Sequence, residues 1–249
     1  MQTHLKAIEK NPEIRVVIIN ANGPVFSSGH DLKELRTNRN TELSGSTYGD
    51  NDNDNDNDND NNASLIDLCS SVMQTVVTLK KPVIAQVEGI ATAAGCQLVA
   101  SCDLAYASNS AKFATPGVDI GLFCSTPAVA LGRSMHKKHA MHMLLTGDMI
   151  SANEAVRIGL INAVIETEGD GEQNLLGDEV LKIAAKIASK SPSAIEIGKP
   201  IFYEQLDMPL NNAYQLASKT MVHNMNHDDA KEGIDAFLTK RTPDWSSTD

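Results

Sequence analysis

Two segments of this chain share one pattern, in which an apolar run ends in small residues and a helix-like stretch follows. They are residues 26–32 (Phe-Ser-Ser-Gly-His-Asp-Leu) and residues 89–96 (Gly-Ile-Ala-Thr-Ala-Ala-Gly-Cys). Where a buried strand turns into a helix, backbone N–H groups are exposed and the helix dipole adds positive potential. Two such turns side by side can point two N–H donors at one oxygen, which makes an oxyanion hole. The pair therefore predicts a shared site at the carboxyl ends of parallel strands.

Apolar runs alternate with helix-like patterns through most of the chain, and the last third is helical throughout. Continuous apolar stretches predict strands at 14–19, 82–87, 103–106 and 161–165, and residues 113–122 predict a Gly-Pro loop. Apolar residues at intervals of three and four predict helices. We place them at 2–10, 31–37 (capped by Asp31), 63–79, 95–101, 126–145, 151–158, 174–190, 192–204, 209–226 and 228–239. This order predicts an α/β fold with a mainly parallel sheet and helices outside it.

A tract of nearly pure Asn-Asp alternation interrupts the pattern. It lies within the polar residues 38–62, which cannot bury apolar surface, so we expect a disordered insertion. Alternating aspartates can hold calcium, but the tract lacks the glycine and terminal glutamate of a calcium loop. The predicted organisation is a core of residues 1–37 and 63–165, the insertion, and a helical C-terminal region at 166–249.

Charge and composition exclude several classes of protein. The 249 residues carry 21 basic and 32 acidic side chains, a net charge of -11, and six of the aspartates lie between residues 50 and 60. A nucleic-acid binder is disfavoured, because there is no basic stripe.

No apolar run reaches the ~20 residues of a membrane span. Residues 1–10 are polar and lack arginine, which indicates neither a signal nor a transit peptide. The four cysteines show no paired spacing, so we expect reduced core thiols and an intracellular protein.

The residues alone also allow a purely structural explanation for each candidate site. The first turn offers the backbone N–H of His30 to a ligand, or it is an ordinary strand-to-helix turn. The second turn lets a ligand approach the backbone, or it is an Ala-Gly helix start packed on the sheet. His136, His139 and His142 do not converge on one helix face, so a solvated face is favoured over a metal site.

Several motifs, in order and at family spacing, resemble the enoyl-CoA hydratase/isomerase (crotonase) superfamily. The resemblance runs from about residue 14 to the end and leaves out only the Asn/Asp tract. The motifs are Phe-Ser-Ser-Gly-His-Asp-Leu, Lys-Pro-Val-Ile-Ala-Gln-Val-Glu-Gly-Ile-Ala-Thr-Ala-Ala-Gly-Cys-Gln-Leu, Cys-Asp-Leu-Ala, Leu-Leu-Thr-Gly and Ser-Ala-Asn-Glu-Ala.

The resemblance implies a spiral of strand-strand-helix units, homotrimers or hexamers, and an acyl-CoA substrate in fatty acid metabolism. Coenzyme A would be part of the substrate, with no separate cofactor. The implied oxyanion donors are the backbone N–H groups of His30 and Ala94, and the implied substrate contacts are Ser28, His30, Asp31, Leu32 and Ala94. More weakly, Lys240 and Arg241 are implied near the CoA phosphates. The most similar members are mitochondrial, which implies the same compartment here.

Two departures from the family pattern limit what the resemblance implies. Hydratases carry two glutamates that hold and activate water, and this chain has Gln97 and Gly117 at those positions. Glutamine cannot move a proton at neutral pH, and general acid–base help is typically worth ~10²–10⁴ in rate. Family members also have a strand and a helix before the point that corresponds to residue 1. We therefore expect a truncated or lost N-terminal segment, which would explain why no transit peptide is visible.

Three functions remain open at this point. The first is an acyl-CoA enzyme of the lyase or isomerase type that needs little proton transfer, such as a malonyl-type CoA decarboxylase. Its polar groups near the site would be Gln97, Asp119, Cys124 and Ser125. The second is a CoA-thioester-binding or regulatory protein without turnover. The third is a weak hydratase whose water is placed by Gln97.

Overall fold

Two four-stranded sheets form the centre of the described part of the chain. The computed structural model describes residues 1–36, 61–166 and 175–245. Sheet A is wholly parallel in the order β1 (Val17–Ile19), β3 (Val83–Val87), β5 (Leu104–Ser108) and β8 (Ala163–Ile165). Sheet B has the order β2 (Val25–Ser27), β4 (Ile90–Thr92), β6 (Lys112–Ala114) and β7 (Ile150–Ser151), and only its β6–β7 pair is antiparallel.

The chain spirals from sheet A to sheet B and then into a helix, turn after turn. Strand β3 leads into β4 and then into α4 (Ala94–Ser101). Strand β5 leads into β6, the 3₁₀ helix η1 (Pro116–Ile120) and α5 (Ser125–Ser134). This confirms the predicted fold class. The sheet-B strands were not predicted separately, because two or three residues are too few to show a period of two.

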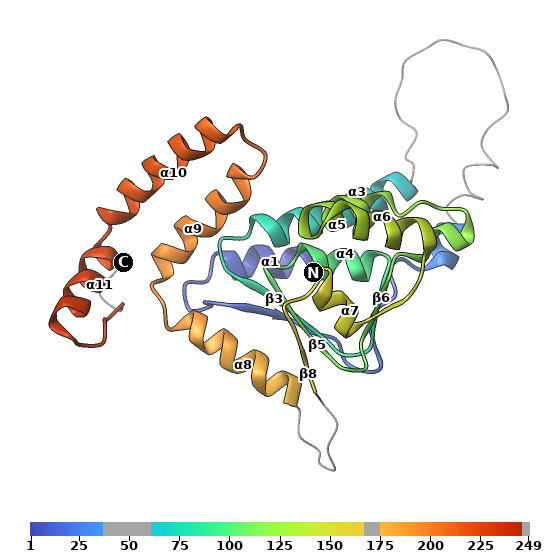
Figure 1. Cartoon of the computed structure of the whole chain (residues 1–249), viewed down its shortest axis with the longest axis horizontal. Coiled ribbons are helices and arrows are strands. Elements are labelled where there is room, and N and C mark those ends of the chain that lie inside the picture. Colours follow the sequence, from blue (N-terminus) through green and yellow to red (C-terminus); the bar gives the residue numbers. More distant parts are fainter. Residues whose placement is uncertain (37–60, 167–174, 246–249) are drawn as a thin grey trace, which may run out of the picture.

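Helices cover both faces of sheet A (Figure 1). On one side lie α1 (Gln2–Glu9), α3 (Asn61–Thr78), α4, α5 and α6 (Lys137–Thr146), while α7 (Ala152–Arg157) follows β7. On the other side α8 (Leu175–Ala188) packs Leu176 and Val180 against Ile84 of β3. Because both faces are covered, every residue of β3 is buried, and this explains its continuous apolar sequence.

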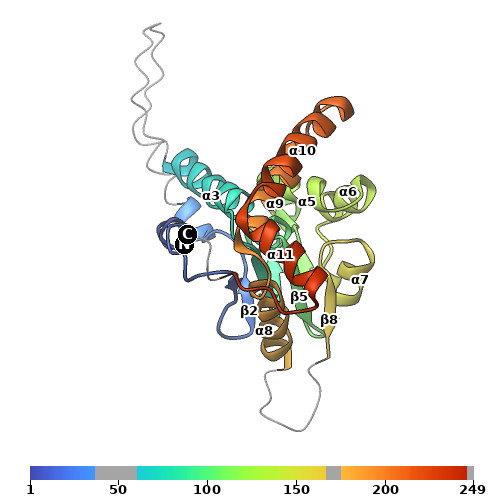
Figure 2. The same cartoon turned by 90° about the vertical axis from the view of Figure 1, so that its left-hand side faces the viewer.

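Three helices follow α8 in the described part of the chain: α9 (Pro192–Gln205), α10 (Leu210–Met225) and α11 (Asp228–Thr239). The Lys199 ammonium holds α9 to the core, 2.7 Å from the Asp103 carboxylate, which also accepts a 2.8 Å hydrogen bond from Tyr203. Helix α10 stands clear of the sheets in both views (Figure 1 and Figure 2). Many large apolar side chains on these helices, and Leu206 at the end of α9, are exposed: Phe202, Leu206, Leu210, Tyr214, Met221, Val222, Met225, Ile234, Phe237 and Leu238.

The structure corrects one predicted helix. Residues 126–145 do not form a single helix, because the chain breaks at Met135 and His136 between α5 and α6. The His136 ring caps α6 by accepting a 3.3 Å hydrogen bond from the Lys138 N–H. Among the described residues, no group of three or more His, Cys, Asp or Glu side chains could hold a metal ion.

Most of the predicted insertion lies outside the described residues, since residues 37–60 are not described and α3 begins at Asn61. Of the helices in the described ranges, none combines the length and the apolar character that a membrane crossing requires.

Candidate functional site

The two glycine-containing turns lie against each other. Strands β2 and β4 pair in parallel with Ser27 opposite Ala91, so the turns that follow them are neighbours. Gly29 has φ +93°, and a Cβ built on it would lie 2.9 Å from the Ala93 Cβ and 3.3 Å from the Ala94 nitrogen. Both the backbone conformation and this contact require glycine at residue 29.

Helix α4 begins at a strained residue. Ala93 has φ 50° and ψ -119°, in a region that residues other than glycine rarely adopt. Its N–H donates a 3.0 Å hydrogen bond to the Ala114 carbonyl at the end of β6, and its own carbonyl accepts one from the Gln97 N–H. As the first helical residue, Ala94 has no acceptor for its N–H within the helix. The N–H of Ala94 is therefore available to a ligand.

The other predicted donor, the N–H of His30, is close by. Standard bond lengths keep the His30 nitrogen within about 7 Å of the Ala94 nitrogen, given the contact of Gly29. Two donors that share one acceptor at ~3 Å lie no more than ~6 Å apart. The placement is therefore compatible with a common acceptor.

The remaining predicted substrate contacts follow the first turn. Asp31 caps the helix at 32–36 as predicted, because its carboxylate accepts a 2.8 Å hydrogen bond from the Lys33 N–H. Ser28 and Leu32 are exposed. These two side chains are open to a ligand that reaches the turn from solvent.

Gln97 is buried on the first turn of α4, and within the described residues its side-chain oxygen is unsatisfied. Its side chain is 4% exposed, and its Oε1 has no hydrogen-bond partner among the described residues. Thr115, which follows β6, is fully buried, and its hydroxyl also has no partner there. Leaving a buried polar atom unpaired costs about 1–3 kcal/mol, so such groups call for a physical explanation. Sequence reasoning missed Thr115, although it is the polar residue in the apolar run Phe-Ala-Thr-Pro.

Gly117 has no room for a side chain. It lies in η1, and the loop closes on it through a 2.9 Å hydrogen bond from the Leu122 N–H to its carbonyl. A Cβ on Gly117 would lie 2.5 Å from the Leu122 carbonyl oxygen and 2.8 Å from the Cys124 Sγ. The Cys124 thiol therefore occupies space that a glutamate at residue 117 would need.

The other two polar candidates have different neighbours. The carboxylate oxygens of Asp119 lie 3.2 and 3.3 Å from the Cβ position of Gly147, which ends α6. The Ser125 hydroxyl donates a 3.3 Å hydrogen bond to the Phe123 carbonyl. Of these three side chains, Cys124 is the one whose heavy atom is among the nearest to the Cβ position of Gly117.

All four cysteines are free thiols. Burial raises the pKa of the Cys96 thiol to about 12, with a smaller contribution from the neighbouring Cys124. Burial and the Asp103 carboxylate raise the pKa of Cys102, and burial raises that of Cys69. These three thiols therefore stay protonated near neutral pH and are poor nucleophiles.

The positive charge at the C-terminus is partly neutralised within the chain. The Arg241 guanidinium lies 2.5 Å from the Glu232 carboxylate and 2.6 Å from that of Asp235. Its hydrogen bonds lower the pKa of Glu232 to about 2. Of the two residues implied near the CoA phosphates, Arg241 is therefore already paired with carboxylates.

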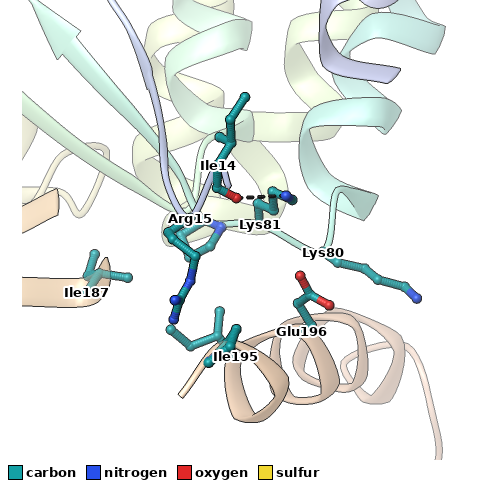
Figure 3. A pocket seen from close by; sticks show the side chains of 9 residues that line it. Ile14, Arg15, Lys80, Lys81, Ile187, Ile195 and Glu196 are labelled. Carbon is teal, nitrogen blue, oxygen red and sulfur yellow. Dashed lines mark hydrogen bonds between the residues drawn. The ribbon is translucent and has the colours of Figure 1, made fainter. Parts of the chain in front are cut away.

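A separate pocket lies at the amino ends of β1 and β3 (Figure 3). Its Lys81 ammonium donates a 2.7 Å hydrogen bond to the Ile14 carbonyl, and its Arg15 guanidinium donates a 2.5 Å bond to the Lys190 carbonyl. Strand β3, which is about 16 Å long at ~3.3 Å per residue, leads away from this pocket, and none of the residues that line the pocket belongs to either turn. The pocket is therefore not part of the candidate site.

Comparisons with known proteins agree with the geometry. The family model described as enoyl-CoA hydratase/isomerase matches residues 1–248. Mouse enoyl-CoA hydratase domain-containing protein 3, mitochondrial, is 49% identical over 237 residues, which are 95% of this chain and 71% of that protein. The crystal structure of the human protein of the same name is 46% identical with a TM-score of 0.82, and the match covers 98% of this chain and 89% of that one. An enoyl-CoA hydratase from Mycobacterium smegmatis is 39% identical with a TM-score of 0.84, over 98% and 86% of the two chains.

Proposed function

Because this chain belongs to the enoyl-CoA hydratase/isomerase family, we propose that it binds an acyl-CoA thioester at the paired turns. The N–H groups of His30 and Ala94 would donate hydrogen bonds to the thioester oxygen. The contact of Gly29 with Ala93 and Ala94 is the observation that carries this proposal. Negative charge that develops on the oxygen would be stabilised there.

Ordinary hydration would be slow at such a site. Gln97 cannot act as an acid or a base at neutral pH, and the space beside Gly117 is filled by Leu122 and Cys124. The site would retain polarisation of the thioester but lack proton transfer. Chemistry that needs little proton transfer, such as loss of carbon dioxide from a malonyl-type thioester, suits it better than addition of water.

The test combines binding with mass analysis. The protein is incubated with crotonyl-CoA, methylmalonyl-CoA and ethylmalonyl-CoA, and each thioester is followed by mass. Gain of water indicates hydration, and loss of carbon dioxide indicates decarboxylation. Thermal stabilisation by the thioesters without turnover indicates a binding protein. If no thioester either stabilises the protein or is converted, the proposed function is wrong.

An amide-to-ester replacement at Ala94 tests the donor directly, since it removes one N–H and leaves the side chain. One hydrogen bond of ~1–1.5 kcal/mol corresponds to a loss of about tenfold in affinity. Unchanged affinity for crotonyl-CoA would show that Ala94 is not a donor to the ligand.

We infer that the chain acts in mitochondria, which the names of its mouse and human relatives support. Fluorescence microscopy of the tagged natural protein tests this.

We also infer a homotrimer or hexamer, since α9, α10 and α11 leave large apolar side chains such as Phe237 uncovered. Light scattering during size-exclusion chromatography would give a trimer or hexamer mass if this is correct, and a monomer mass if it is not.

A further inference from the structure

The pocket at the amino ends of β1 and β3 carries more positive than negative charge (Figure 3). Three cationic side chains line it, those of Arg15, Lys80 and Lys81, against the single carboxylate of Glu196. Helix α9 begins at the pocket with Pro192, and the amino end of a helix adds positive potential. The pocket therefore favours an anion over a cation or a neutral ligand.

Lys81 is a buried cation without an acidic partner in the described part of the chain. It is 3% exposed, and its ammonium donates hydrogen bonds to the carbonyls of Asn11 and Ile14 but forms no ion pair with a described carboxylate. Lys199 provides the contrast, because its buried ammonium lies 2.7 Å from the Asp103 carboxylate. A buried charge without a countercharge is costly, since the protein interior does not replace its hydration. Lys81 thus calls for a negative charge from outside the described residues.

Two of the cations keep N–H groups for such a charge. An ammonium has three N–H groups, and Lys81 donates two of them to carbonyls. A guanidinium has five, and Arg15 donates one to the Lys190 carbonyl at 2.5 Å. Among the described residues neither Arg15 nor Glu196 forms an ion pair, although the Glu196 carboxylate points from α9 toward the side of the pocket where Lys81 lies (Figure 3). The remaining N–H groups are therefore donors for an anion.

The walls and the size of the pocket select among anions. Apolar side chains form the rest of the wall: Ile14, Pro82, Ile187, Pro192 and Ile195. A phosphate or sulfate has four oxygens, and some of them would lie against these side chains without a donor. The space inside is about the size of one water molecule, which suits a monatomic anion. Chloride meets both conditions.

We propose that Arg15, Lys81 and the amino end of α9 bind chloride in this pocket. The ion would supply the negative charge that the buried lysine lacks. Because the end of α8, the start of α9 and the residues before β1 and β3 all line the pocket, the ion would also stabilise the attachment of α9 to sheet A. This site is separate from the paired turns and does not depend on the thioester proposal.

Thermal unfolding of the full chain in potassium chloride and in potassium gluconate, at equal ionic strength, tests the proposal. Gluconate is too large for the pocket. At a chloride concentration about tenfold above its dissociation constant, the melting temperature should be about 3–6 °C higher than in gluconate. Crystals grown with bromide should show an anomalous scattering peak between Arg15 and Lys81. Equal melting temperatures in the two salts, or no bromide at this place, would overturn the proposal.

Three variants separate binding from a structural role. Arg15→Gln should weaken chloride binding about tenfold and shrink the difference between the salts, whereas a purely structural Arg15 would lower both melting temperatures equally. Glu196→Gln should tighten binding at least about twofold, because it removes a repelling charge. If Glu196→Gln instead lowered the melting temperature in both salts without tightening binding, Glu196 would be the countercharge of Lys81 and the proposal would be wrong. Arg157→Gln is the matched control, since that arginine pairs with Glu154 on α7 and should leave the salt difference unchanged.

Discussion

The first turn of α4 packs directly on the end of β2, because a Cβ on Gly95 would lie 2.2 Å from the carbonyl oxygen of Ser27. Real Cβ atoms do not approach a backbone oxygen so closely, so only glycine allows this contact. It holds the start of α4 beside the turn that carries His30. The proposed oxyanion site therefore depends on a residue that would not itself touch the ligand.

Gly95→Ala should separate the two turns. We expect a loss of about 1–3 kcal/mol in unfolding free energy, as for other overpacked sites, together with weaker binding of crotonyl-CoA. Urea denaturation and calorimetric titration measure the two effects. Gly132→Ala in α5 is the control, because no atom lies within 4 Å of its Cβ position. It should stabilise the helix by about 0.5–1 kcal/mol; equal losses in both variants would contradict the packing argument.

Ala93→Gly should stabilise the protein. Glycine adopts the observed φ of 50° and ψ of -119° without a Cβ penalty, and relief of such strain is worth about 1–3 kcal/mol. The greater freedom of glycine in the unfolded chain offsets part of this gain. Because the backbone path does not change, affinity for crotonyl-CoA should stay the same. A lower melting temperature by calorimetry would argue against strain at this residue.

Gly117→Ala should destabilise the protein although it adds only one methyl group. The methyl would meet the Leu122 carbonyl and the Cys124 Sγ, at a cost of about 1–3 kcal/mol. Cys124→Ala in the same background should recover part of the loss, because it removes one of the two clashing atoms. A double-mutant cycle by chemical denaturation measures this coupling. Strict additivity of the two changes would show that the thiol does not fill the space.

Alkaline pH should weaken the fold through Cys96. Its pKa is raised from 9.0 to about 12 in the folded protein. Below pH 9 the thiol is protonated in both states and contributes no pH dependence. Between pH 9 and 12 only the unfolded chain releases the proton, so unfolding free energy falls as pH rises, by up to ~1.4 kcal/mol per pH unit. Melting temperatures at pH 8, 9.5 and 11, under reducing conditions, should fall less steeply in Cys96→Ala. If melting temperature fell equally steeply with pH in the wild type and in Cys96→Ala, Cys96 would not be the source of the pH dependence.

Lys199→Met should release α9 from the core. The Lys199 side chain is 8% exposed and that of Asp103 is 17% exposed, so the variant leaves a largely buried carboxylate without its cation. Breaking such a pair costs about 3–5 kcal/mol. Tyr203→Phe removes only the hydroxyl bonded to Asp103 and should cost about 1 kcal/mol. If chemical denaturation gave the reverse order, the ion pair would not be the main anchor.

The sequence predicted the neighbourhood of the site better than its interior. Small residues after two apolar strands were enough to place the turns at His30 and Ala94 together, because this pattern is local. The break before α6 was not visible, because His136 caps the helix with a ring that is not among the usual capping side chains. The crowding of Gly117 depends on the backbone path of residues 122–124. No periodic pattern in the sequence predicts that path. The unpaired state of Thr115 is likewise a property of tertiary contacts.

The thiol lodged beside Gly117 bears on the evolutionary history open to this chain. In a lineage with this loop, replacing the glycine codon by one for glutamate would first meet a folding penalty, before any gain in chemistry. Room for the glutamate side chain would need a second substitution at Cys124 and a new course for the Leu122 carbonyl. Single substitutions that place a longer side chain at residue 117 are therefore selected against by their effect on folding alone, whatever they would add to the chemistry of the site.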